Sequence, residues 1–165
     1  MRQRCTFGVQ ASPFELRSTE RGDRSAVVRE GARYDLCGRV LFVLEEAWVV
    51  DVGIAVYGNR LLPPNVAAGD MVAGDAYLGI ESPAVYDDAF FRAAPPLRYS
   101  WRIEGIRLET TPWLEVAPRS LMRDETRVGY VDVERTNAWE DDAGRGHYVL
   151  DCALLGGPTP RHDGR

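Results

Sequence analysis

The chain has 165 residues, of which 20 are basic and 25 acidic, and its formal net charge is −5. The length predicts one domain with a substantial core, and the charge disfavours non-specific attraction to nucleic acid. Every basic residue is an arginine, which excludes a P-loop and catalysis by lysine. No apolar run has transmembrane length and no apolar segment follows the basic N-terminus, so we expect a cytoplasmic protein.

The first part of the chain has weak patterning. We expect residues 1–33 to form an N-terminal extension or first strands, with a mobile loop in the charged stretch "RSTERGDRS". Residues 34–155 are predicted to form a β-barrel domain, and residues 156–165 a disordered tail.

The next segments carry the strongest β-signal. Residues 35–44 are apolar, and residues 48–57 alternate in polarity, so the two are predicted as an antiparallel hairpin. Gly69 and Asp70 form a predicted turn, in which the Asp70 side chain accepts a backbone hydrogen bond. In the following strand, residues 71–80, alternation places Asp75 on the face opposite the apolar side chains.

A short helix is expected after this strand, because Ser82 suits an N-cap position and Pro83 the first helical position. Residues 97–109 then read as a long strand, and "TTPWLEVAPRSL" as a connection broken by proline. Two further strands, "RVGYVDVER" and "GHYVLDCALLG", flank a polar loop. Strand alternation predicts one continuous core from Val50, Val52, Ile54, Val72, Leu78, Tyr99, Trp101 and Ile103.

This order of elements predicts a mainly β fold, an antiparallel barrel or sandwich with one short helix between central strands. Hairpin-linked strands, then a capped helix, then more strands resemble the OB-fold over roughly residues 34–155. The resemblance rests on element order and on the Gly-Asp turn. It implies a capacity to bind oligonucleotides or oligosaccharides, but a fold does not determine a function.

The cysteines and histidines give no metal-binding pattern. Cys5, Cys37 and Cys152 are far apart and contain no C-x-x-C pair, and His147 and His162 lie far from the first two. The five acids from Asp70 to Asp88 fall on a turn, a strand face, a helix-cap region and a helix, which favours a solvated surface over a convergent site. We therefore predict no catalytic residue, no metal ligand and no cofactor.

Two sets of residues are candidates for contact with a macromolecule. The acidic loop holds Trp139, Asp141 and Asp142, and an exposed tryptophan there suits contact with another protein. Packing of Trp139 back on the barrel is an equal alternative. Arginines alternate with aromatic residues in "RYSWRIEGIR", as in proteins that bind single strands. Period-two alternation favours ordinary half-burial of that strand; if nucleic acid binds, the contacts are Arg98, Arg102 and Arg107.

The sequence thus favours a non-catalytic binding protein with a protein partner, of the immunity, inhibitor, accessory-subunit or adaptor type. The first alternative is an OB domain that binds single-stranded nucleic acid. The second is a small enzyme that uses carboxylates in the barrel mouth.

Overall fold

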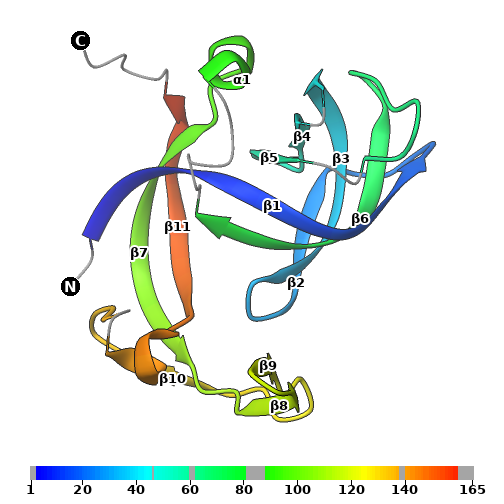
Figure 1. The fold of residues 1–165 in the computed structure, drawn as a ribbon. Helices are drawn as coiled ribbons and strands as arrows, with labels where there is room; N and C mark the ends of the chain where they lie inside the picture. The colour runs from blue at the N-terminus through cyan, green and yellow to red at the C-terminus, as the bar shows by residue number, and fades with distance from the viewer. Residues whose placement is uncertain (1–2, 46, 60–61, 81–87, 138–139, 160–165) are drawn as a thin grey trace. The chain divides into compact units, whose positions relative to one another are not determined.

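The computed structural model describes residues 3–45, 47–59, 62–80, 88–137 and 140–159. Its fold is mainly β with one short α-helix between β6 and β7, which confirms the predicted fold class (Figure 1). The strands are β1 Gln3–Thr19, β2 Ser25–Glu30, β3 Arg33–Leu44, β4 Ala47–Asp51, β5 Ala55–Asn59, β6 Met71–Ile80, β7 Arg98–Glu109, β8 Trp113–Ala117, β9 Ser120–Arg123, β10 Tyr130–Asp132 and β11 Tyr148–Thr159. The helix is α1, Asp88–Ala93, and a short 3-10 segment, η2, covers Asp141–Gly144.

The chain divides into two compact units. The barrel unit consists of Thr6–Ser100 with Gly156–Arg165, and the second unit consists of Met1–Cys5 with Trp101–Leu155. The segment 1–33, predicted as an extension or first strands, contains β1 and β2. Strand β11 continues through Thr159, within the segment predicted to be a disordered tail.

The barrel unit is a closed ring of five strands. Strand β1 pairs with β6, β6 with β3, β3 with β4, and β4 with β5, all antiparallel. A parallel pair between β5 and β1, with Val9 opposite Val56, closes the ring. Strand β2 pairs with β3 outside the ring. Closure leaves these five strands without a bare edge over the paired residues.

The predicted core residues are buried or half-buried. Val50, Val52, Val72, Tyr99 and Trp101 are buried, while Ile54, Leu78 and Ile103 are half-buried. Burial extends to both faces of β4 and β5, where the fully buried side chains include Trp48, Val49, Val56 and Tyr57. The two-faced burial was not predicted, because alternation assigns one face of a strand to solvent.

The prediction of a single strand over residues 48–57 was wrong. β4 ends at Asp51 and β5 begins at Ala55, and the two strands pair with each other. Between them Gly53 has a φ of 106°, and its N–H donates to Asp51 Oδ1 at 2.9 Å. The Asp51 side chain and the positive φ of Gly53 therefore stabilise a tight turn between β4 and β5.

The predicted turn at residues 69 and 70 is confirmed. Gly69 has a φ of 101°, and Asp70 Oδ2 accepts a hydrogen bond from Ala67 N at 2.8 Å. The helix predicted to begin at Ser82 is described from Asp88 onward, and its first residues lie outside the described part of the chain.

The second unit contains the later part of β7, which pairs with β10 and with β11. The segment 110–121 was predicted as a proline-broken connection. Residues 113–123 instead form a separate two-stranded hairpin of β8 and β9. Pro118 and Arg119, which has a φ of 64°, lie in its turn, and Pro112 precedes β8, so neither proline interrupts a strand.

Candidate functional site

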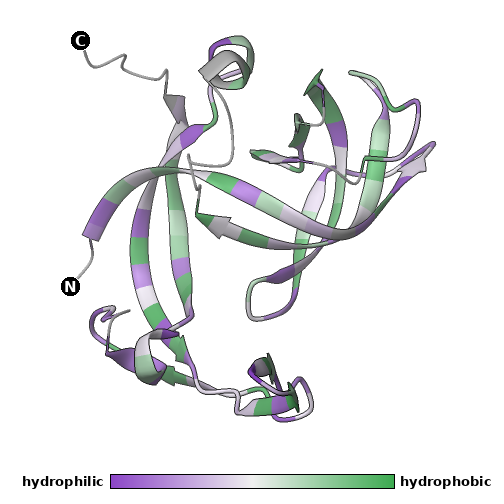
Figure 2. Cartoon of the chain, viewed as in Figure 1, coloured by the Kyte–Doolittle hydropathy of each residue, from purple (hydrophilic) through white to green (hydrophobic). Residues whose placement is uncertain are grey.

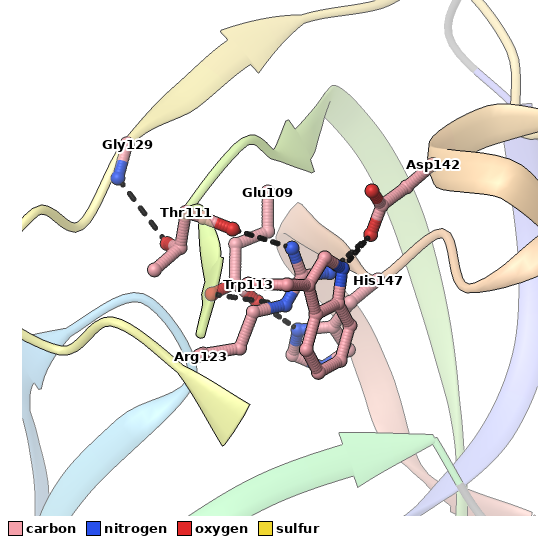
Figure 3. A network of polar contacts seen from close by, with 7 residues as sticks. All are labelled: Glu109, Thr111, Trp113, Arg123, Gly129, Asp142 and His147. Atoms are coloured by element: carbon pink, nitrogen blue, oxygen red, sulfur yellow. Dashed lines mark hydrogen bonds and ion pairs between the residues drawn. The ribbon is translucent and has the colours of Figure 1, made fainter. Parts of the chain in front are cut away.

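Arg123, at the end of β9, contacts several residues of the second unit (Figure 3). Its guanidinium lies over the Trp113 ring, 4.0 Å from the centroid, and its Nη1 donates to the Thr111 carbonyl at 2.6 Å. Nη2 lies 2.8 Å from Asp142 Oδ2 and Nε lies 3.9 Å from Glu109 Oε1. Nη2 makes no hydrogen bond to a described residue, so its contact with Asp142 is an ion pair without hydrogen-bond geometry.

These contacts connect the β8–β9 hairpin to neighbouring residues of the second unit. Trp113 Nε1 donates to Asp142 Oδ2 at 2.7 Å, which joins β8 to η2. The Thr111 hydroxyl is buried and accepts a hydrogen bond from Gly129 N at 3.3 Å. Hydrogen bonds from Thr126 and Arg127 hold the pKa of the Asp124 carboxyl, just after β9, below its usual value. The residues beside the two ends of the hairpin, Thr111 and Asp124, thus have hydrogen-bonded side chains.

Glu109 connects this network to a surface histidine. Its Oε2 lies 2.6 Å from His147 Nδ1, and its backbone N–H donates to the His147 carbonyl. The Glu109 side chain is 12% exposed, whereas that of His147 is 57% exposed. A neutral imidazole that donates from Nδ1 keeps its lone pair on Nε2. Glu109 orients the His147 ring in the way that a carboxylate orients a catalytic histidine. Among the described residues, this ring has no polar side-chain partner other than Glu109.

The acidic loop holds the predicted protein-contact residues. Trp139 lies outside the described residues. Asp141 Oδ2 accepts hydrogen bonds from the Tyr148 hydroxyl at 2.5 Å and from Asn137 N at 3.2 Å. Desolvation and then the Asp141 hydrogen bond raise the pKa of Tyr148, which keeps its hydroxyl as a donor. Asp141 and Asp142 are half-buried, and both carboxylates accept hydrogen bonds within the second unit.

The three arginines predicted for nucleic-acid contact lie along β7. Arg102 pairs with Glu104 at 2.7 Å, and Arg107 pairs with Asp151 at 3.0 Å and lies over the Tyr130 ring. Arg98 is half-buried and belongs to the barrel unit, whereas the other two belong to the second unit. Carboxylates beside Arg102 and Arg107 reduce the positive potential that a phosphate backbone would meet.

The β8–β9 hairpin carries exposed apolar side chains. The hairpin contains hydrophobic segments (Figure 2). Leu114, Val116, Leu121 and Met122 are 42%, 53%, 38% and 55% exposed, and we call these four residues the apolar hairpin. Leu114 lies directly opposite Met122, and Leu121 lies on the other face, opposite Glu115. Both faces of the hairpin therefore present apolar groups to solvent. Clustered exposed apolar groups mark interaction sites, whereas isolated ones do not.

The barrel unit has a charged cleft of about 500 Å³ on its outer face. Glu15, Asp75 and Asp35 form a row across β1, β6 and β3, because Asp75 lies opposite both other acids. The remaining lining residues are Arg17, Arg29, Arg33, Leu36, Ala73 and Gly74. Arg33 pairs with Asp75 through Nε and Nη2, and Arg29 pairs with Asp35. Asp75, expected to be a surface residue, is thus a half-buried partner of Arg33.

The cysteines have the character of structural residues. Burial, with lesser effects of Cys5 and nearby acids, raises the pKa of Cys152 to about 11. Burial also raises the pKa of Cys5. Both thiols are therefore protonated at neutral pH, which makes them poor nucleophiles and poor metal ligands. Within the described ranges, no three His, Cys, Asp or Glu side chains are placed to share a metal ion.

Sequence reasoning missed the Arg123 network and the cleft. Their residues come from segments that are far apart in the chain and join only through strand pairing. The sequence contains one local signal for each. Trp113 and Arg123 lie at the two ends of the β8–β9 hairpin. Arg33 and Asp35 are charged residues two positions apart in one strand, although Cys37, the next in that series, is not charged.

Comparison with known proteins finds no matching family model, no matching curated protein and no matching solved structure. None of the described helical segments has the length and apolar character needed to span a bilayer.

Proposed function

We propose that this protein is a non-catalytic binding protein that binds another protein through the apolar hairpin. The observation that carries the proposal is the exposure of four large apolar side chains within nine consecutive residues of β8 and β9. An isolated two-stranded hairpin is marginally stable in water, and its apolar side chains gain by burial against a partner.

The base of the hairpin supports this role. Arg123, stacked on Trp113 and paired with Asp142, holds both strands to the rest of the second unit. A surface that is ordered before binding loses less conformational entropy on association than a mobile one. Met122 has a flexible side chain that adapts to a partner surface, and Arg123 Nη1 already donates to the Thr111 carbonyl.

The alternatives have weaker support. For nucleic-acid binding, Arg102 and Arg107 already have carboxylate partners. For catalysis by carboxylates in the barrel mouth, Asp75 and Asp35 lie in the outer cleft and are paired with arginines. Among the described residues, the Glu109–His147 pair has acid–base character, and we keep an enzyme as the second candidate on that ground.

The test compares which proteins are captured by matched variants. Wild type, Leu114→Ser/Met122→Ser and the control Val131→Ser are immobilised, and captured proteins are quantified by mass spectrometry. Val131 is a similarly exposed apolar residue of the same unit, on β10. We expect at least one protein to be retained by the wild type and the control and lost by the double variant, and then to bind as a purified protein. Equal retention of every captured protein by all three forms contradicts the proposal.

A further inference from the structure

The charged cleft of the barrel unit contains two charges that the fold does not neutralise. Its six ionisable side chains are three arginines and three acids, and two ion pairs, Arg33–Asp75 and Arg29–Asp35, use two of each. Glu15 and Arg17, both exposed on β1, have no ion pair or hydrogen bond with another side chain in the described chain. One cation and one anion therefore face the cleft with their charges available.

The geometry of β1 sets the distance between these two charges. Glu15 and Arg17 lie two residues apart, opposite Asp75 and Ala73, so they share the outer face of the sheet. Their Cα atoms are about 7 Å apart along the strand. Ala73, across from Arg17, has a short side chain and also lines the cleft.

Two register shifts in the strand pairing lie beside the cleft. The pairing of β1 with β6 shifts register between Pro13 and Glu15, immediately before the free acid. The pairing of β2 with β3 shifts between Val28 and Glu30, at the position of Arg29. Bulges are frequent beside functional sites, where they re-aim a side chain. At Gly74, in the cleft wall, a Cβ atom would collide with the Glu15 carbonyl, so β1 and β6 approach closely there.

We propose that this cleft binds a short zwitterionic molecule, with its carboxylate on Arg17 and its ammonium group on Glu15. The lining carries no net charge, since three arginines match three acids, so a simple anion or cation meets as much repulsion as attraction. A molecule with both charges satisfies both free groups at once. Charges separated by about 5–7 Å match the strand spacing, which favours a dipeptide or an ω-amino acid over an α-amino acid.

The experiment is an amide NMR titration of the full chain with glycylglycine. We expect saturable shifts at residues 15–17, 33–36 and 73–75. N-acetylglycylglycine, which lacks the ammonium group, and glycylglycine amide, which lacks the carboxylate, each bind about tenfold more weakly or worse.

Variants locate the binding site. Arg17→Gln and Glu15→Gln are expected to lose the shifts while keeping the wild-type spectrum elsewhere, and the control Glu20→Gln, outside the cleft lining, is expected to bind as wild type. Absence of saturable shifts, binding of either blocked form as tightly as glycylglycine, or unchanged binding by both cleft variants overturns the proposal.

Discussion

Arg123→Met is the substitution that most sharply tests the Arg123 network. The replacement keeps an apolar stem over Trp113 but removes the cation, its hydrogen bond to the Thr111 carbonyl and its ion pairs with Asp142 and Glu109. Glu109 is 12% exposed, so its carboxylate would be left partly desolvated with only His147 beside it.

The expected cost follows from these contacts. Removal of one partner of a fully buried ion pair costs about 3–5 kcal/mol, and a lost hydrogen bond to a charged group about 1.5–3 kcal/mol. The Asp142 side chain retains 27% exposure, so water offsets part of this loss. We therefore expect the free energy of unfolding of the second unit to fall by about 2–4 kcal/mol.

The assay is urea unfolding followed by tryptophan fluorescence, with hydrogen exchange of residues 109–123 to localise the effect to this unit. Arg102→Ala is the control, because Arg102 and Glu104 form an exposed pair, worth about 0–1 kcal/mol. Surface substitutions usually change the free energy of unfolding by ~0.5 kcal/mol. If Arg123→Met and Arg102→Ala lower this free energy by amounts that differ by no more than ~0.5 kcal/mol, the network does not hold the hairpin and the reasoning is refuted.

Three further predictions concern single positions, and a fourth concerns the net charge. Val52 is buried, so Val52→Asp should prevent folding of the barrel unit, and a soluble variant with unchanged melting would contradict this. Gly69→Ala, at a φ of 101°, should lower stability by about 1 kcal/mol in chemical denaturation, whereas Gly79→Ala, which meets no neighbour, should not; equal effects would refute the turn argument. The pKa of Cys152, about 11, leaves roughly one thiol in a thousand ionised at about pH 8. Alkylation of Cys152, followed by mass spectrometry, should therefore be slow in the native state, become faster as the pH rises toward this pKa, and be fast after unfolding. Fast labelling of the native protein at neutral pH would contradict the burial. The net charge of −5 predicts weak binding of random single-stranded DNA, and micromolar anisotropy binding that weakens steeply with salt would favour the nucleic-acid alternative.

Much of the barrel could be predicted from strand alternation, and its main error has a physical explanation. Val50, Val52 and Val72 are buried as alternation indicates. The same pattern of valine and isoleucine continues through residues 52–54, so it concealed the turn that Asp51 and Gly53 make. Here local turn chemistry overrides a period-two signal, and the Asp-x-Gly spacing was the available warning.

Burial on both faces of β4 and β5 could not be predicted from local pattern. In a single open sheet, one face of β4 and β5 would be exposed to solvent, and side chains such as Tyr57 or Val49 would lie on it. Here ring closure and α1 supply further apolar contacts. Phe90 on α1 is buried and lies beside Tyr57, with ring centroids 6.2 Å apart. Such contacts depend on long-range pairing, which a window of sequence does not contain.

The candidate sites depend even more on long-range pairing. Arg123 lies 14 residues after Glu109, 10 after Trp113 and 19 before Asp142 in the chain. Only the pairing of β8 with β9, and of β7 with β11, brings their side chains together. The exposure of the apolar hairpin could not be predicted for the same reason. The sequence shows which residues are apolar but not which of them the folded sheet leaves exposed to solvent.

The most direct measurement for a protein-binding role of the apolar hairpin is amide hydrogen exchange of the full chain with and without a purified protein that it captures. The account predicts that the partner slows exchange in residues 113–123 and that Leu114→Ser/Met122→Ser abolishes both binding and protection, while Val131→Ser retains them. Protection confined to other segments, with residues 113–123 exchanging as in the free protein, would contradict it.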